Sequence, residues 1–350
     1  MDSDRDILRD AANRLLADHV DKALLERAEG GAWAGALWTA LEANGLTQPL
    51  VPESAGGAGA SWADAFVIVE AAGRHAAPVP LPETMLAGWL LARTGLPVPT
   101  GPLALAPVRS GDALRLEGGR LSGTVAGVPW GRYAGHLVAL AQSAAGPQLV
   151  LIGAGAWTAT FDRNIAGEPR DRLVLESAPT LAAAACNIDM VRYGALMRSA
   201  QMAGALARCV DACIGYAQER VQFGRRIGQF QAIQHQLAEL AAQAAQATLA
   251  AEIAFTAADR GDPWFEAAAA KIVCGEAAGM AASIAHGVHG AMGFTYEHPL
   301  HFSTRRLWSW RTEFGAESHW AEALGRQTAA RVADALWVDL TARQAAGSAA

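Results

Sequence analysis

The sequence has 350 residues, of which 52% are hydrophobic and 18% are charged. A chain of this size can bury a substantial core and is typical of two or three structural units. Its net charge of −6 and its isoelectric point near 5.9 argue against a nucleic-acid-binding protein, because no basic surface would attract phosphate groups.

The first ten residues, MDSDRDILRD, carry charges from position 2 onward, so we expect no secretory signal. No uninterrupted apolar run reaches the roughly 18 to 20 residues that cross a membrane, and we expect no membrane span. Four cysteines without a CxxC motif are typical of a reducing compartment, so we expect a cytoplasmic protein without disulfides. Cys209 and Cys213 lie four positions apart and are expected to be buried as small apolar residues.

Residues 1–95 are expected to form an α-helical domain. The segment SWADAFVIVEAAGR (61–74) has the pattern of an amphipathic helix, with Ser61 as the N-cap and Asp64 three positions later. The glycine-rich segment VPESAGGAGA (51–60) lacks the preceding strand and the lysine or threonine of a phosphate-binding loop. We interpret it as a connection between helices.

The pattern changes in residues 96–183, where proline and glycine separate short apolar runs of strand length. This pattern predicts a compact middle β domain, a barrel or a sandwich. The runs are LALAPV (103–108), LRLEGGRLSGTV (114–125), HLVALA (136–141) and QLVLIGA (148–154).

Residues 184–345 are rich in alanine and predict long helices over 197–222 and 230–260. Alanine at this density allows helices to approach closely, as in an antiparallel four-helix bundle. The expected fold class is therefore mainly α with a β insert: a helical domain, a β domain and a helical bundle.

Between the two long helices lies RVQFGRRIGQFQAIQ (220–234), which is rich in arginine, glutamine and glycine. Four apolar residues of the second helix recur at helical spacing and predict one buried face: Phe230, Ile233, Leu237 and Leu240. Four polar residues are left without a role in the core: Arg220, Gln222, Gln231 and Gln234. Guanidinium groups beside a helix start bind diphosphates well, which favours an anionic cofactor. A solvated helix connection capped at Gly224 is the alternative.

The longer stretch RVQFGRRIGQFQAIQHQLAEL (220–240) resembles the signature helix corner of the acyl-CoA dehydrogenase family. Residues 45–84, GLTQPLVPESAGGAGASWADAFVIVEAAGRHAAPVPLPET, resemble the N-terminal helical domain of that family. Residues 286–307, HGVHGAMGFTYEHPLHFSTRRL, resemble its glycine turn and the segment that follows. The order of helices, β domain and helices agrees as well. The resemblance implies that FAD is the cofactor and that the reaction is α,β-dehydrogenation of an acyl-CoA thioester.

The resemblance also implies that FAD lies across a subunit interface, in a dimer or a dimer of dimers. Arg220 and Phe223 would contact the ADP half of the flavin, with Gln231 nearby. The turn at Gly290 and Gly293 would hold a flavin tail from a neighbouring subunit through backbone N–H groups. The full set of expected cofactor-binding residues is Arg220, Gln222, Phe223, Gln231, Gly287, Gly290, Ala291 and Gly293.

The chain departs from the family around the flavin ring. The acidic, glycine, serine and aspartate stretch of the family is reduced here to LALAPVRSGD (103–112). Only Trp130, in VPWGRY, resembles the tryptophan-containing stretch. The glutamine expected before the glycine turn is replaced by Gly287.

The chain also departs from the family at the catalytic base. Phe314 occupies the usual glutamate position, and Gly194 occupies the other position known for the base. We therefore expect no catalytic residue in this chain, with Glu317 and Glu313 as weak candidates. This pattern resembles the non-catalytic subunit of bacterial heteromeric acyl-CoA dehydrogenases, which act on bulky thioesters such as those of steroid side chains. The expected partners are a second acyl-CoA dehydrogenase chain in an α2β2 complex, or a second copy, and an electron-transfer flavoprotein as acceptor.

Three other interpretations remain open. A metal site is one, because four histidines and a glutamate lie close together in the sequence: His286, His289, His298, His301 and Glu297. We expect no metal. A homo-oligomeric flavoenzyme with an atypical base, either an oxidase or a monooxygenase, is the second. A subunit that assembles without contacting flavin is the third.

Overall fold

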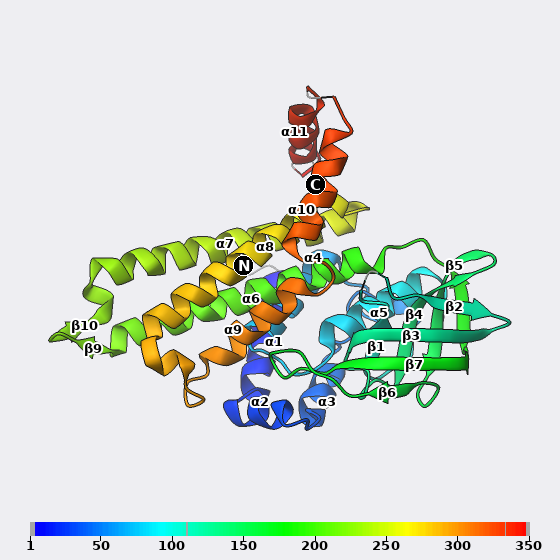
Figure 1. Ribbon diagram of the computed structural model, residues 1–350, viewed down its shortest axis with the longest axis horizontal. Coiled ribbons are helices and arrows are strands. Elements are labelled where there is room, and N and C mark those ends of the chain that lie inside the picture. Colours follow the sequence, from blue (N-terminus) through cyan, green and yellow to red (C-terminus); the bar gives the residue numbers. More distant parts are fainter. Residues whose placement is uncertain (1–3, 110, 333, 348–350) are drawn as a thin grey trace.

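The computed structural model describes residues 4–109, 111–332 and 334–347. Helices come first, an eight-stranded sheet follows, and long helices complete the chain (Figure 1). The bundle of long helices and the sheet lie at opposite ends of the molecule, with the N-terminal helices packed against both. This arrangement confirms the expected fold class.

The N-terminal region contains five α-helices joined by short loops. Ser61 and Asp64 form the expected capping box: the Ser61 hydroxyl accepts a hydrogen bond from the Asp64 backbone N–H, and the Asp64 carboxylate accepts one from the Ser61 N–H. The glycine-rich segment is a connection, as expected, and contains the short 3₁₀ helix η1 (Glu53–Ala55). The helices are α1 (Asp4–His19), α2 (Lys22–Glu29), α3 (Gly35–Ala43), α4 (Trp62–Arg74) and α5 (Leu81–Arg93).

The middle region forms one sheet in the order β6-β7-β3-β2-β4-β5-β8, with β1 paired to β4 in parallel. Most neighbouring strands are antiparallel, and alternate apolar side chains build a core of their own on one face. The strands are β1 (Leu103–Ala106), β2 (Leu114–Glu117), β3 (Arg120–Pro129), β4 (His136–Ser143), β5 (Gly146–Gly153), β6 (Thr158–Thr160), β7 (Arg170–Pro179) and β8 (Ala182–Ala185).

The C-terminal region begins with α6 (Met190–Glu219), α7 (Gln231–Arg260) and α8 (Trp264–His289), which pack side by side. The side chain of Asp189 accepts hydrogen bonds from the first backbone N–H groups of α6, so this helix starts earlier than residue 197. The 3₁₀ turn η3 (Gly290–Phe294), α9 (Leu300–Thr312), α10 (Glu317–Ala329) and α11 (Ala335–Gly347) follow; α10 and α11 extend away from the body (Figure 1).

Two glycines bring α4 and α6 into backbone contact. A Cβ atom at Gly73 would lie 2.0 Å from the carbonyl oxygen of Gln201, and a Cβ atom at Gly204 would lie 1.9 Å from that of Glu70. Neither position can hold a side chain without moving the two helices apart. This contact joins the N-terminal region to the bundle.

One segment bears on the expectation that the chain has no membrane span. By length and hydropathy, the segment Trp264–Phe294, which includes α8, is apolar enough to cross a bilayer. Its most apolar window is 61% buried inside the molecule, because α8 packs against α6, α7, α9 and α10. All four cysteines are free and buried, and Cys209 and Cys213 lie in the apolar core of the bundle as predicted. The expected domain limits at 95/96 and 183/184 stay predictions.

Candidate functional site: a cofactor clamp and an empty base position

The segment between α6 and α7 is a β-hairpin, not a simple helix connection. α6 ends at Glu219, so the expected helix to residue 222 is wrong at its end, where β9 (Val221–Gln222) pairs with β10 (Arg225–Arg226). The two turn residues, Phe223 and Gly224, have φ angles of 52° and 77°. Positive φ at both positions is the geometry of a tight type I′ hairpin. We call residues 220–226 the Arg220 hairpin.

The side chains of the hairpin are exposed on the surface of the chain. The side chain of Phe223 is 92% exposed, and that of Arg220 makes no ion pair within the described part of the chain. Arg225 lies 4.1 Å over the ring of Phe230, which fixes one wall of the hairpin. Gln234 is different: its amide donates a hydrogen bond to the carbonyl of Gly228 at 2.9 Å, so its role is structural.

The glycine turn η3 exposes backbone next to the exposed side chains of Met292 and Phe294. A Cβ atom at Gly287 or Gly290 would meet no atom within 4 Å, and Gly290 has a positive φ of 56°. Ala291 is exposed as well, whereas Gly293 is buried, because a Cβ there would lie 2.9 Å from that of His289. Open backbone at such a turn fits a phosphate-bearing cofactor tail.

The histidines around this turn do not form a metal site. Within the described residues, no group of three or more His, Cys, Asp or Glu side chains is arranged to hold a metal ion. His289 stacks on Tyr216 with ring centroids 4.5 Å apart, and its Nδ1 donates to the carbonyl of Ala285. His286 shares a hydrogen bond with the hydroxyl of Thr304.

The two positions at which the sequence predicts the family's base lie against each other. A Cβ atom at Gly194 would lie 2.2 Å from Cδ1 of Phe314, so the phenyl ring covers the glycine. Phe314 is 3% exposed and has a positive φ of 54°. Its carbonyl accepts from the indole of Trp320, and the ammonium of Lys271 donates to the carbonyls of Arg311 and Gly315. The turn is therefore held firmly with an apolar ring in the base position.

Phe314 also lines a cavity of about 610 Å³ between the sheet and the bundle. Residues from β3, α6 and the segment after α9 surround it, including Pro129, Val191 and Glu313. Trp130 is not among them; it packs on Trp33 and Tyr133 in the direction of the N-terminal region. Val108 and Arg109 of the LALAPVRSGD stretch line the cavity, and Ser110 lies outside the described residues.

Glu313 is ionised and forms ion pairs inside the fold. Its carboxylate accepts hydrogen bonds from Arg170 of β7 and Arg198 of α6, each at 2.7 Å. Burial opposes the charge, but these two arginines lower the pKa of Glu313 to about 2. Arg198 also binds Glu83 of α5 at 2.6 Å, so the cluster joins all three regions of the chain.

Glu168 extends this ionic cluster on its other side. Its carboxylate accepts from Arg170 and Arg306, and also from the indole of Trp310. The complete cluster contains three acids and three bases: Glu83, Glu168, Glu313, Arg170, Arg198 and Arg306.

Glu317, the other weak candidate, does not line the Phe314 cavity. It begins α10, whereas Phe314 precedes that helix, so the two residues do not share a helical face. The Glu317 carboxylate accepts from Nε of Arg311 at 2.7 Å, which holds its pKa below the usual range. Neither acid beside Phe314 is free to take a proton from a ligand.

Sequence reasoning missed the cationic partners of this region. Arg198 and Lys271 are fully buried charges on alanine-rich helices, a local signal that could have been noticed. Arg306 gave no such signal, because Glu168 lies 138 positions away. The pairing of Arg170 with Glu313 gave none either, because these residues are 143 positions apart.

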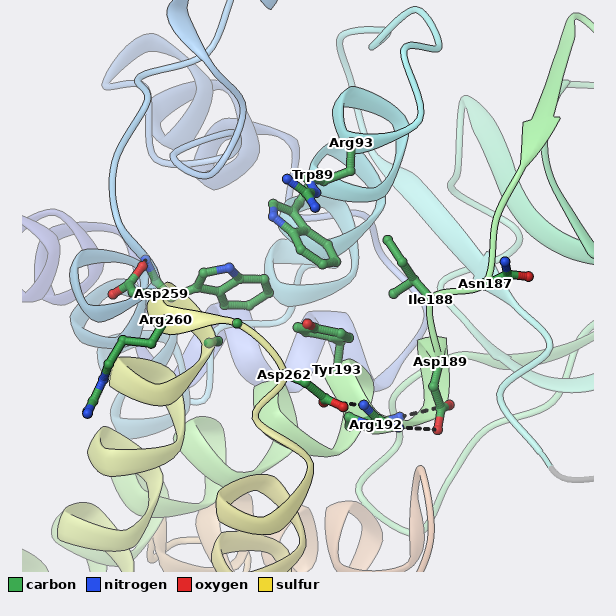
Figure 2. Close-up of a pocket in the computed structure, with 13 residues that line it drawn as sticks. Trp89, Arg93, Asn187, Ile188, Asp189, Arg192, Tyr193, Asp259, Arg260 and Asp262 are labelled. Atoms are coloured by element: carbon green, nitrogen blue, oxygen red, sulfur yellow. Dashed lines mark hydrogen bonds and ion pairs between the residues drawn. The ribbon is translucent and has the colours of Figure 1, made fainter. Parts of the chain in front are cut away.

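A second cavity of about 600 Å³ lies on the other side of the start of α6 (Figure 2). Trp62, Trp89 and Tyr193 form its aromatic wall, with ring centroids 4.6 to 5.3 Å apart. Arg192 is bound by Asp189 and Asp262 across its floor (Figure 2). The rings contact each other and Arg192 is neutralised, so these side chains chiefly hold α4, α5 and α6 together.

The Arg220 hairpin and the Phe314 cavity lie at opposite ends of α6. Gly194 and Arg220 are 26 positions apart along this helix and its C-cap, which corresponds to about 39 Å of axial rise. Figure 1 shows the hairpin at the far end of the bundle from the sheet.

Comparison with known proteins identifies two matching domains. Residues 187–329 match the acyl-CoA dehydrogenase C-terminal domain, and residues 2–97 match the N-terminal domain. Acyl-CoA dehydrogenase IpdE2 of Mycobacterium tuberculosis is 30% identical over 308 residues, covering 87% of this chain and 90% of the relative.

Solved structures agree with this match. The steroid ACAD Tcur3481-Tcur3483 is 26% identical, with a TM-score of 0.85 over 93% of this chain and 97% of the other. The ChsE4-ChsE5 complex from M. tuberculosis has the same fold, with 23% identity and a TM-score of 0.87 over 95% and 99% of the two chains. The FAD complex of PigA also shares the fold, with 19% identity and a TM-score of 0.83 over 94% and 98%. FAD is the cofactor of this family, and the chain belongs to the acyl-CoA dehydrogenase family.

Proposed function

We propose that this chain is a subunit of a heteromeric FAD-dependent acyl-CoA dehydrogenase, in which it holds the ADP half of a flavin whose ring lies in a partner chain. The observation that carries the proposal is the separation of Arg220 from the Phe314 cavity by the length of α6, about 39 Å. FAD is much shorter than this distance. A flavin held at Arg220 therefore places its ring in another chain.

The chain's own residues bind and orient the cofactor. Arg220 pairs with the diphosphate, and the exposed ring of Phe223 covers the adenosine side, with Gln222 and Gln231 as hydrogen-bonding neighbours. The exposed backbone at Gly290 and Ala291 receives a flavin tail through N–H groups, with Gly287 and Gly293 on either side of it. Bound FAD would accept the β-hydrogen of the thioester as a hydride.

The general base comes from the partner. Removal of the α-proton needs a positioned carboxylate, which contributes roughly 10²- to 10⁴-fold in rate. Phe314 and Gly194 offer none, and Glu313 is held by Arg170 and Arg198. A glutamate of the paired chain, beside its own flavin ring, completes the reaction.

The substrate is a bulky acyl-CoA thioester, with a steroid-derived acyl group as the leading candidate. This follows from the likeness to the steroid ACAD Tcur3481-Tcur3483, and an electron-transfer flavoprotein is the proposed acceptor in the cytoplasm. A homo-oligomeric flavoenzyme is the second candidate, because each chain carries both a hairpin and a cavity of about 610 Å³. Such an enzyme would bind one FAD per chain without a second gene product.

The test compares the chain alone with the chain co-expressed beside a second acyl-CoA dehydrogenase of the same genome that keeps its glutamate. We expect the chain alone to be colourless or poor in FAD, and the α2β2 complex to be yellow. A homo-oligomer with one FAD per chain that oxidises acyl-CoA would contradict the heteromer.

In that complex, Arg220→Ala should weaken FAD binding by about 10- to 100-fold, because one charge-assisted contact worth roughly 1.5–3 kcal/mol is lost. Titration of FAD into the apo-complex by fluorescence measures this. Arg326→Ala, which removes an exposed arginine of α10, is the control and should bind FAD like the wild type. Equal affinity for Arg220→Ala would remove Arg220 from the site.

A further inference from the structure

Four imidazoles surround the glycine turn η3. His286 and His289 come from the end of α8, His298 from the loop after η3, and His301 from the start of α9. We call these residues the histidine cluster. The rings of His289 and His298 lie 4.5 Å apart, and the ring of His286 lies 4.6 Å from that of Phe294, a residue of the turn itself.

Backbone contacts fix which ring nitrogen faces a carbonyl in two of these histidines. Nδ1 of His289 faces the carbonyl of Ala285 at 2.8 Å, and Nδ1 of His301 faces the carbonyl of His298 at 2.9 Å. A carbonyl only accepts, so each Nδ1 carries the proton. The Nε2 atoms of both rings are buried and have no hydrogen-bond partner in the described structure. A second proton on His289 would create a buried N–H group without an acceptor.

No acid compensates such a charge. No described carboxylate lies within ion-pair distance of the four imidazoles. The other groups that face them are Tyr216 and Cys213 of α6, Thr304 and Phe302 of α9, and Tyr296 of the loop. Arg208 of α6 adds a positive charge near His298. Glu297 is fully exposed and is influenced by Lys22 of α2.

Burial lowers the pKa of His286, His289 and His298, and the nearby imidazole of His289 lowers the pKa of His286 and His298 further. A histidine with a lower pKa in the folded state stabilises the fold above its unfolded pKa of about 6.5. Below that pH the unfolded or opened state takes up the proton first. The stability of the turn is therefore present at neutral and alkaline pH and is lost as the pH falls.

We propose that the histidine cluster makes the glycine turn sensitive to protonation. As the pH falls below about 6.5, the turn loosens and binds the flavin tail more weakly. This proposal rests on the proposed function for its effect on FAD, but its effect on the turn belongs to this chain alone. An acidic medium would thus release the cofactor tail without any change at the Arg220 hairpin.

The experiment measures FAD affinity of the assembled complex at pH 7.5 and 5.5. Each imidazole that takes up a proton on release weakens binding by about tenfold per pH unit, so two predict a loss approaching 100-fold per unit. The variants are His298→Gln and the double change His289→Gln with His298→Gln, which should show a flatter pH dependence. His19→Gln, an exposed histidine of α1, is the matched control and should behave like the wild type. Equal pH dependence in the wild type and the double variant would overturn the proposal.

A second measurement separates this inference from the proposed function. The urea midpoint of the FAD-free chain should fall further between pH 7.5 and 5.5 in the wild type than in the double variant. If the complex holds no FAD at pH 7.5, the proposed function fails. The urea midpoints then test the histidine cluster by themselves. A larger fall between pH 7.5 and 5.5 in the wild type than in the double variant supports the proposal, and equal falls reject it.

Discussion

At the scale of single residues, Phe314 and Gly194, which the sequence predicts at the two base positions, pack against each other. The phenyl ring occupies the volume that a side chain at position 194 would need, with a Cβ-to-ring distance of 2.2 Å. A glutamate at position 194 cannot enter while Phe314 stays in place. Phe314 also packs with Ala195, Ala268 and Trp320, and this apolar cluster stabilises the turn.

Glu313 gives a sharp prediction about stability. We expect Glu313→Gln to destabilise the fold by about 3–5 kcal/mol, because Arg170 and Arg198 would remain buried with too little negative charge. Urea unfolding at pH 7 measures this. The control is Glu322→Gln, which breaks an exposed pair with Arg326 and should cost about 0.2–1 kcal/mol.

The same residue sets a pH dependence. Because the pKa of Glu313 is lowered to about 2 in the folded chain, its contribution is present above the unfolded range near 4.5 and is lost as the pH falls toward 2. Glu313→Gln should therefore lose less stability than the wild type over that range. An unchanged acid dependence would contradict the role given to the carboxylate.

Some of these residues could be predicted from the sequence and others could not. Counting along the chain placed Phe314 and Gly194 at the two base positions. The contact between them could not be predicted, because it joins residues 120 positions apart. The ion pairs of Glu313 could not be predicted for the same reason, since Arg170 and Arg198 are 143 and 115 positions away from it. Local spacing carries no information on such contacts.

At the scale of secondary structure, the sequence predicted an element correctly where the interacting residues are close together in the chain. Ser61 and Asp64 predicted the start of α4, because both halves of the capping box lie within four residues. The Arg220 hairpin was missed, because type I′ turns usually carry Asn-Gly or Asp-Gly, and here Phe223 takes the first position with positive φ. An exposed aromatic in that strained position is more easily explained by a ligand than by the fold.

The contact between α4 and α6 yields a prediction with an internal control. Gly204→Ala should destabilise the chain by more than 1 kcal/mol, because the new Cβ would lie 1.9 Å from the carbonyl oxygen of Glu70 and the helices must separate. Gly215→Ala, on the same helix, meets no atom within 4 Å and should stabilise it by about 0.5–1 kcal/mol. Thermal unfolding distinguishes them; similar shifts in both variants would disprove the close contact.

At the scale of the whole molecule, three regions are tied together around one buried ionic cluster. Glu83, Glu168 and Glu313 come from the helical, middle and C-terminal regions, and three arginines join them. The order of these regions was readable from the sequence, because the spacing of apolar residues changes at each boundary. Their relative placement was supplied by the family resemblance. The matched C-terminal domain ends at residue 329, so α11 lies beyond it.

The Arg220 hairpin has a consequence for proteolysis. It presents Arg220, Arg225 and Arg226 on an exposed two-stranded loop at the end of the bundle, which is the kind of segment that trypsin cuts. We expect the free chain to be cleaved there first, into a fragment ending near residue 226 and one beginning with α7. In the assembled complex with FAD the same bonds should resist cleavage, because partner and cofactor cover them. Equal cleavage rates in both states would place the hairpin outside the interface, whereas protection would let a protease report when this subunit has found its partner.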